Sequence, residues 1–309
     1  MADNTPLVLI IRDGWGQAPP NCPDAPDKTN GIVNAHTPVA DELFNSALTT
    51  MVQTSGLSVG LPEGVMGNSE VGHQNIGAGR IVPQELMRLS LAAESGAFAS
   101  NNVIQEVFRH GQDGHTAHIV GLVSDGCIHS DIAHLFALID VIPTDANVCI
   151  HVITDGRDTS PTSGLVFASE LEDRIRDTNV HIASVMGRFY AMDRDHRWER
   201  VARAYEAMTG IQTTHPDAGN VSVQTATSAT SAIESYYNNP STPSQLGDEF
   251  ITPTVIVNND GAPIGQVQPG DSVFFFNYRG DRPRELTRAF IFNDEEWAAV
   301  PRTPFVRGN

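Results

Sequence analysis

The sequence has little lysine, little cysteine and no long apolar run. Lys28 is the single lysine among 19 basic residues, and 37 acidic residues bring the net charge to −18. A chain this acidic lacks the broad basic surface that nucleic acids and anionic membranes need, so neither is an expected partner. No stretch approaches transmembrane length. The apolar run at 7–11 is too short for a signal-peptide core and has no basic region before it.

The three cysteines, Cys22, Cys127 and Cys149, are an odd number and include no C-x-x-C pair. They therefore indicate neither a disulfide framework nor a zinc knuckle, and they fit a reducing compartment. Together with the missing membrane and leader signals, this predicts a soluble cytoplasmic protein.

The remaining composition is that of an ordinary globular protein, with 40% hydrophobic and 18% charged residues in 309. That length suggests about two domains. Eighteen of the basic residues are arginines. The planar guanidinium group suits carboxylate and phosphate, so the bias matters where arginines cluster, whereas genomic composition explains the scattered ones.

A regular alternation of strand and helix patterns begins near residue 115. Continuous apolar runs predict strands at 7–11, 117–124, 147–154, 180–186, 254–257 and 272–277. Helical spacing predicts helices at 37–46, 85–95, 130–141, 161–177, 197–209 and from 283. The alternation predicts an α/β fold with a mostly parallel sheet covered by helices on both faces. Residues 211–248 read as an excursion with one helical patch at 229–237.

Four of the predicted strands end in polar clusters. These contain His129, then Arg157 with Asp158, then Arg188 with Arg194, and finally Arg279 with Arg282. Because parallel strands place their carboxyl ends at one edge, these side chains are expected to be neighbours in space. Each alone is better explained as a surface salt-bridge residue. Five arginines at one edge repel one another unless they share an anion, which favours a site for a small phosphate- and carboxylate-bearing ligand.

Two further residues precede the regular alternation. Ser69 lies between Gly67 and Gly72, before residues that favour a helix start, and is a candidate nucleophile next to an anion site. An ordinary glycine-rich turn is the simpler interpretation. Asp13 follows the predicted strand 7–11, where a turn-forming Asp-Gly is equally common. A carboxylate and a hydroxyl suggest cation coordination or an activated nucleophile, and two residues complete neither.

Motifs in a fixed order run over nearly the whole chain. They are Asp-Gly-Trp-Gly at 13–16, Gly-Leu-Pro-Glu-Gly-Val-Met-Gly-Asn-Ser-Glu-Val-Gly-His at 60–73, Asn-Ile-Gly-Ala-Gly-Arg at 75–80, Ser-Asp-Gly-Cys-Ile-His at 124–129, Asp-Gly-Arg-Asp at 155–158, Gly-Arg-Phe-Tyr-Ala-Met-Asp-Arg-Asp at 187–195, Asp-Glu-Phe-Ile-Thr-Pro-Thr-Val-Ile at 248–256 and Phe-Asn-Tyr-Arg-Gly-Asp-Arg at 276–282. With these motifs the sequence resembles the cofactor-independent (2,3-bisphosphoglycerate-independent) phosphoglycerate mutases.

The resemblance implies a glycolytic isomerase that interconverts 3-phosphoglycerate and 2-phosphoglycerate through a phosphoserine. It implies that Ser69 is the nucleophile, and that Asp13 and Ser69 are ligands of two divalent ions, usually manganese. Substrate-binding positions match His129, Arg157, Asp158, Arg188, Arg194, Arg279 and Arg282. It also implies a usually monomeric protein with two parts. Residues 1–83 would be a segment of an alkaline-phosphatase-like α/β domain, left incomplete, and residues 84–309 a mostly parallel-sheet phosphotransferase domain.

The sequence departs from the family in its metal-binding residues. The family's Asp-x-x-x-His and Asp-His pairs, a further metal-binding histidine and a substrate-binding lysine have no counterparts, and Asp195-His196 belongs to another motif. Arg12 stands where the family has an apolar residue. Three explanations stay open: an N-terminal fragment, half of a split enzyme that needs a complementing C-terminal chain, or a catalytically incomplete phosphoglycerate-binding module. A metal-dependent phosphomonoesterase is a further class.

Overall fold

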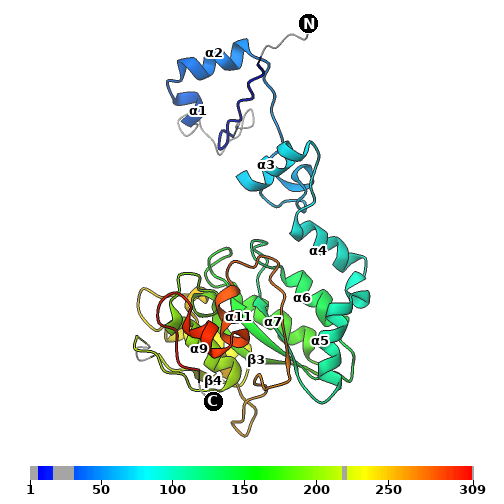
Figure 1. Ribbon diagram of the computed structural model, residues 1–309, viewed down its shortest axis with the longest axis vertical. Coiled ribbons are helices and arrows are strands. Elements are labelled where there is room, and N and C mark those ends of the chain that lie inside the picture. The colour runs from blue at the N-terminus through cyan, green and yellow to red at the C-terminus, as the bar shows by residue number, and fades with distance from the viewer. Residues whose placement is uncertain (1–5, 17–30, 218–220, 308–309) are drawn as a thin grey trace. The chain divides into compact units, whose positions relative to one another are not determined.

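The computed structural model describes residues 6–16, 31–217 and 221–307. By its internal contacts the chain divides into two compact units, Met1–Pro83 and Gln84–Asn309, coloured from blue to red along the chain in Figure 1. Cys22 and Lys28 lie outside the described residues.

The described part of the first unit is helical. It contains α1 (Gly31–Asn34), α2 (Pro38–Ser46), the 3-10 helix η1 (Gly56–Val59) and α3 (Ser69–Ala78). The helix predicted at 37–46 is confirmed as α2, with proline at its first position, where a missing N–H costs nothing. Thr37 precedes it and donates its hydroxyl to Asp41 Oδ1 at 3.2 Å instead of capping the backbone.

The strand predicted at 7–11 is wrong. Leu7, Val8 and Leu9 are 96%, 76% and 72% exposed, and these residues belong to no β-ladder within the described chain. A strand needs a neighbour for its N–H and C=O groups, and among the described residues none lies beside this run. A run of apolar side chains indicates that these side chains favour burial, but it does not show that a neighbouring strand is present to pair with them.

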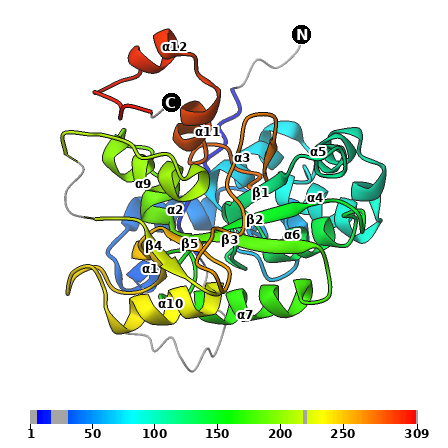
Figure 2. The same cartoon turned by 90° about the horizontal axis from the view of Figure 1, so that it is seen from below.

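The second unit is built on one six-stranded sheet of order β4-β5-β3-β2-β1-β6. Its strands are β1 (Ala117–Leu122), β2 (Val148–Thr154), β3 (Val180–Gly187), β4 (Gln224–Ala226), β5 (Thr254–Ile256) and β6 (Ser272–Phe275). β1 runs parallel to β2 and β6, β2 to β3, and β4 to β5, whereas β5 is antiparallel to β3. The predicted α/β class with a mostly parallel sheet is therefore confirmed (Figure 2).

Helices cover both faces of this sheet (Figure 2). One face packs against α5 (Asn102–Gln112), α6 (Ile132–Ile139), α7 (Gly164–Ile175) and α10 (Ala229–Asn238). The other packs against α8 (Arg188–Ala191), α9 (Trp198–Thr209), α11 (Arg284–Ile291) and α12 (Asp294–Ala298). β1 and β2 are buried along their whole length, which explains why their sequences are apolar without alternation. Within the described residues, no helix combines the length and apolar character needed to cross a membrane.

The helices predicted in this unit are present, with shifted ends. α4 (Glu85–Glu94), α6, α9 and α11 begin within two residues of the predicted starts. α7 begins three residues after Pro161, because residues 161–163 form a turn whose geometry Asp248 fixes. The Asp248 amide donates to the Pro161 carbonyl at 2.8 Å, and Asp248 Oδ2 accepts the Gly164 amide at 2.7 Å. That carboxylate satisfies one of the unpaired N–H groups at the helix start.

The helical patch predicted at 229–237 is confirmed as α10, but the interpretation of residues 211–248 as an excursion missed a strand of the sheet. β4 extends the sheet at its edge, and α10 packs against α7 with Ala232 and Ile233 buried. β4 escaped prediction because Gln224-Thr225-Ala226 has no apolar pattern. The antiparallel direction of β5 was not predicted either, since this strand pairs with β3 only through Ser184–Val255 and Val185–Thr254.

Candidate active site

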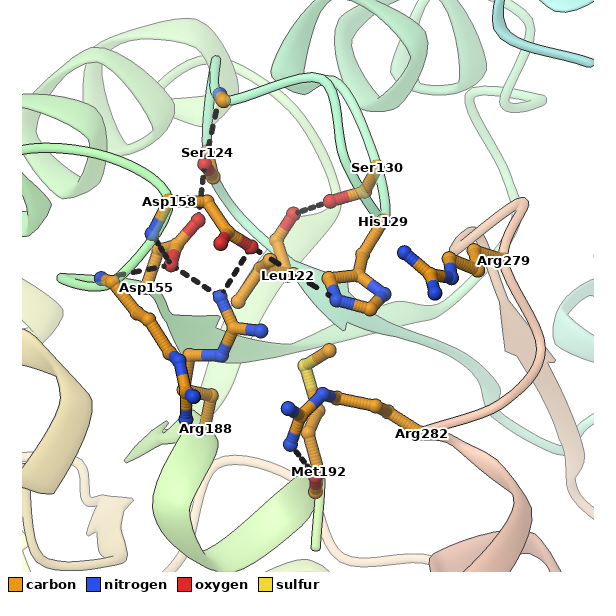
Figure 3. A network of polar contacts seen from close by, with 12 residues as sticks. Leu122, Ser124, His129, Ser130, Asp155, Asp158, Arg188, Met192, Arg279 and Arg282 are labelled. Atoms are coloured by element: carbon orange, nitrogen blue, oxygen red, sulfur yellow. Dashed lines mark hydrogen bonds and ion pairs between the residues drawn. The ribbon is translucent and has the colours of Figure 1, made fainter. Parts of the chain in front are cut away.

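Four loops leave the sheet at one edge, after β1, β2, β3 and β6. These strands are parallel, so their carboxyl ends meet there, as expected for ligand sites in open α/β sheets. The structure brings to this edge His129, Arg157, Asp158, Arg188, Arg194, Arg279 and Arg282. Figure 3 shows the side chains of His129, Arg188, Arg279 and Arg282 pointing toward one another.

Arg188 lies at the buried centre of the cluster. Its Nη1 donates to Asp155 Oδ1 and to Asp158 Oδ2, both at 2.6 Å, and its side chain is 2% exposed. Asp155 also accepts the Ser124 hydroxyl at 2.6 Å and the amides of Arg157 and Asp158. Burial alone would raise the pKa of Asp155, but these hydrogen bonds and Arg188 lower it. Arg188 is thus neutralised by the loop after β2, and Asp155 links that loop in turn to Ser124 after β1.

His129 is a buried neutral imidazole. Its side chain is 4% exposed, with Nε2 3.9 Å from Asp158 Oδ2 and Nδ1 3.6 Å from Asp281 Oδ1. Burial, followed by the charge of Arg188, lowers the pKa of His129 to about 4, although Asp281 and Asp158 act in the opposite direction. Within the described residues Nδ1 has no hydrogen-bond partner. The ring is therefore neutral at neutral pH, and its buried Nδ1 faces Asp281 without a hydrogen bond to it.

The other four arginines are held less firmly. Arg194 and Arg279 share Asp281, at 3.1 and 3.3 Å, while Arg157 lies 3.5 Å from Glu249. Arg282 donates to the Met192 carbonyl at 3.0 Å, not to a carboxylate. Burial, and then the neighbouring charges of Arg188, Arg194 and Arg157, lower the pKa of Arg282.

The sequence leads us to expect that the five arginines repel one another unless they share an anion. Carboxylates of the protein relieve part of that repulsion. Five guanidinium groups face four carboxylates, those of Asp155, Asp158, Asp281 and Glu249. Sequence reasoning included only Asp158 among the site residues. Asp155 and Asp281 stand inside the same short motifs as the predicted arginines, which is the signal that could have found them. Positive charge remains in excess at the edge, concentrated on Arg282.

Asp248 is a further residue of this edge that the sequence did not single out. It is fully buried, and besides the Gly164 amide it accepts the hydroxyl of Tyr237 from α10. Its own carbonyl accepts the Thr154 hydroxyl at 2.8 Å. A Cβ on Gly156 would come within 2.8 Å of Asp248 Cβ, so only glycine allows this approach. Asp248 therefore fixes the loop that carries Arg157 and Asp158.

Ser69 is the first residue of α3, so it does not lie in a simple turn. Asn68 caps the helix by accepting the Val71 amide at 3.0 Å, and Gly67 is required because a Cβ there would lie 2.0 Å from the Thr54 carbonyl. Ser69 Oγ is 3.2 Å from His73 Nδ1, which also lies 2.8 Å from the Ser69 carbonyl. A carbonyl only accepts, so Nδ1 carries the hydrogen and points it at Ser69.

Asp13 lies exposed in a turn in which Arg12 stacks on Trp15, the guanidinium 3.5 Å from the ring centroid. Throughout the described residues no group of three or more His, Cys, Asp or Glu side chains is arranged to hold a metal ion. Hard divalent ions need more protein ligands than Asp13 and Ser69 provide. The described residues alone therefore do not fit the expected pair of manganese ions.

Comparison with known proteins gives a consistent result. The family model described as the N-terminus of the BPG-independent PGAM matches residues 89–306. A 2,3-bisphosphoglycerate-independent phosphoglycerate mutase of Rhodopirellula baltica is 52% identical over 98% of this chain and 54% of its own length. The Myxococcus xanthus mutase is 47% identical over 93% and 52%. The chain thus spans about half the length of these curated relatives.

A solved structure shares the fold. Leishmania mexicana phosphoglycerate mutase, crystallised at low cobalt concentration, has a TM-score of 0.68 and 31% sequence identity to this chain. The match covers 89% of this chain and 50% of that one.

Proposed function

Because the chain belongs to the family of 2,3-bisphosphoglycerate-independent phosphoglycerate mutases, we propose that it acts in the interconversion of 3-phosphoglycerate and 2-phosphoglycerate. Mutases of this kind are isomerases that move a phosphoryl group between two hydroxyls of one molecule. We also propose that residues 84–309 form the substrate-binding transferase domain and residues 1–83 a segment of the alkaline-phosphatase-like domain.

The observation that carries the proposal is the excess positive charge around His129. Phosphoglycerate bears a carboxylate and a phosphate, and guanidinium groups bind both with paired hydrogen bonds. Arg194, Arg279 and Arg282 come from two loops and are bound to one shared carboxylate and one carbonyl, partners that an anion can replace. Neutral His129 can add one neutral hydrogen bond to a hydroxyl or carboxylate.

Ser69 receives the phosphoryl group in the proposed reaction. Its Oγ bonds to phosphorus as the bond from phosphorus to the glycerate C3 oxygen breaks, and the serine proton passes to that oxygen. The glycerate reorients, its C2 hydroxyl attacks the phosphoserine, and a proton returns to Ser69. The N–H groups at the start of α3 favour a phosphate there. The family's metal ions would stabilise the negative charge on the transferring group.

Turnover and binding, measured on the same sample, test this function. If the chain carries out the whole reaction, it converts 3-phosphoglycerate to 2-phosphoglycerate with added manganese, and Ser69→Ala abolishes that turnover with affinity changed less than about twofold. Binding without turnover would assign the chain the role of a phosphoglycerate-binding module or of one half of a two-chain enzyme. The absence of calorimetric binding would overturn the proposed substrate.

A further inference from the structure

Two loops of the candidate site are joined by three hydrogen bonds. The first loop, residues 192–196, follows α8 and carries Arg194, while the second, residues 279–285, carries Arg279 and Arg282 and leads into α11. Arg194 reaches across to Asp281, and Arg282 reaches back to the Met192 carbonyl. The third contact involves no arginine of the site: Glu285 Oε1 accepts the His196 amide at 3.0 Å.

Glu285 is buried beside a second carboxylate. Its side chain is 5% exposed, and within the described residues its Oε2 is buried without a recorded donor. The neighbouring group is Asp193, whose side chain is 2% exposed. Asp193 Oδ1 already accepts the amides of Asp195 and Arg197, and Oδ2 pairs with Arg200 at 3.2 Å. Asp193 is thus supplied with donors and an ion-pair partner, whereas among the described residues Glu285 Oε2 has no recorded donor.

We propose that Glu285 and Asp193 share one proton, and that this buried carboxyl–carboxylate hydrogen bond holds the Arg194 loop against the Arg282 loop while an anion is bound. A proton on Oε2 gives that atom a hydrogen bond to donate and leaves one negative charge for Arg200 to balance. The inference rests on the proposed function in that the bound anion is taken to be phosphoglycerate.

The contact of Glu285 with the His196 amide is needed because a bound anion competes for the two arginine contacts between the loops. An anion that draws Arg194 away from Asp281 and Arg282 away from Met192 removes both arginine contacts between the loops. The Glu285 contact is then the one that remains of the three. It also holds His196, whose φ of 56° is left-handed and unfavourable for a residue with a side chain. Glu285 is therefore a positioning residue that acts through Arg194 and Arg282.

The shared proton makes the contact sensitive to pH. Burial, together with the nearby charge of Asp193, raises the pKa of Glu285 to about 7, although the His196 amide opposes this. The other groups facing it are the His196 ring, with Nε2 3.9 Å from Oε1, and Arg288 on α11. Deprotonation would leave two buried carboxylates that repel each other, so affinity for the anion should fall as pH rises through this range.

Calorimetric titration with 3-phosphoglycerate at pH 6.5 and 8.5 tests the proposal. We expect wild-type affinity to fall about fivefold at the higher pH, whereas Glu285→Gln, which keeps a donor without titrating, binds equally at both. Glu295→Gln, the same change at an exposed glutamate of α12, should retain the wild-type pH dependence. A Glu285→Gln protein that keeps the wild-type pH dependence would overturn the proposal.

A second measurement separates this proposal from the proposed function. Carboxyl ¹³C NMR should show Glu285 titrating near pH 7, with the side-chain Nε signals of Arg194 and Arg282 following the same transition in wild type but not in Glu285→Gln. If the protein binds no phosphoglycerate at either pH, the substrate assignment fails, and these signals still decide the shared proton. Titration of Glu285 below pH 5, or arginine signals that ignore it, would contradict the proposal.

Discussion

Arg188 and Asp155 form an ion pair of 2.6 Å in which both side chains are 2% exposed. The arginines of the site are of two kinds, which differ in whether the guanidinium already has a carboxylate partner. Arg188 is bound to Asp155 and Asp158 without any ligand, whereas Arg282 has only a carbonyl for its guanidinium to donate to among its recorded contacts. Position at the end of a strand brings a residue to the edge, and its partners then decide whether it supports the fold or is available to an anion.

Arg188→Met should destabilise the protein by about 3–5 kcal/mol, because it leaves Asp155 buried and Asp158 half-buried without the guanidinium that both accept from. Urea unfolding measures the change. Arg176→Ala is the control: Arg176 is 68% exposed and pairs with Asp173 one turn away on the surface, so its loss should cost under about 1 kcal/mol. Equal losses in the two variants would contradict the structural role of Arg188.

Arg282→Ala should weaken 3-phosphoglycerate binding about 10- to 100-fold, the range for losing a hydrogen bond to a charged group. Stability should change little, because the deleted guanidinium leaves no carboxylate unpaired and takes positive charge away from Arg188, Arg194 and Arg157. Calorimetry gives the affinity and urea unfolding the stability, with Arg176→Ala again as control. A variant that binds as tightly as wild type would remove Arg282 from the site.

The sheet could be predicted from the sequence because its central strands are apolar on both faces. Runs such as 148–154 allow no other placement in a chain this size, and the polar residues after them then fall at one edge. The pairing of side chains could not be predicted, since nothing in Asp-Gly-Arg-Asp says that Asp155 and Asp158 both turn to Arg188 and leave Arg157 to Glu249. Whether residues 7–11 and 224–226 form strands could not be predicted either, because a strand depends on a pairing partner elsewhere in the chain. Residues 224–226 have one in β5, whereas residues 7–11 have none within the described chain.

The protein should lose stability in mild acid through a buried chain of neutral histidines. Asp271 Oδ2 lies 3.2 Å from His118 Nε2, His118 Nδ1 lies 2.9 Å from His151 Nε2, and His151 Nδ1 lies 2.7 Å from the Ser184 hydroxyl. The contact between the two rings has one donor and one acceptor only when at least one ring is neutral. Burial lowers the pKa of His118, against the pull of Asp271, and lowers the pKa of His151 far more.

The sign of this effect follows from which state takes up the protons. Below pH 6.5 the unfolded histidines protonate while the folded ones do not, so stability falls by up to about 1.4 kcal/mol per pH unit for each. Asp248 and Glu285, whose pKa values are raised to about 6 and about 7, act in the opposite direction and reduce the slope. We expect a lower urea midpoint at pH 5.0 than at pH 7.5, and a smaller difference in His151→Gln. A pH dependence that is just as large in His151→Gln as in wild type would show that the His151 ring is not held neutral.

The Asp248 clamp should be measurable as a coupling between α7 and α10. Asp248 accepts the Gly164 amide that begins α7 and the Tyr237 hydroxyl from α10, so Asp248→Ala leaves both donors without that partner, at a cost of about 2–4 kcal/mol. Tyr237→Phe removes one donor and should cost about 1–2 kcal/mol. It should also raise the pKa of Asp248 above about 6, since the tyrosine hydrogen bond is the largest influence lowering it against burial.

A double-mutant cycle separates the clamp from simple loss of packing. If the Tyr237 hydroxyl acts through Asp248, the double variant should cost about 1 kcal/mol less than the sum of the single changes, as measured by urea unfolding. Tyr236→Phe is the matched control: it lies on the same helix and donates to the Gln245 carbonyl at 2.9 Å, so its effect should add to that of Asp248→Ala. The clamp also holds Glu249 beside Arg157, so Asp248→Ala should weaken phosphoglycerate binding whereas Tyr236→Phe should not. Additive effects of Tyr237→Phe and Asp248→Ala would mean that the two side chains act independently.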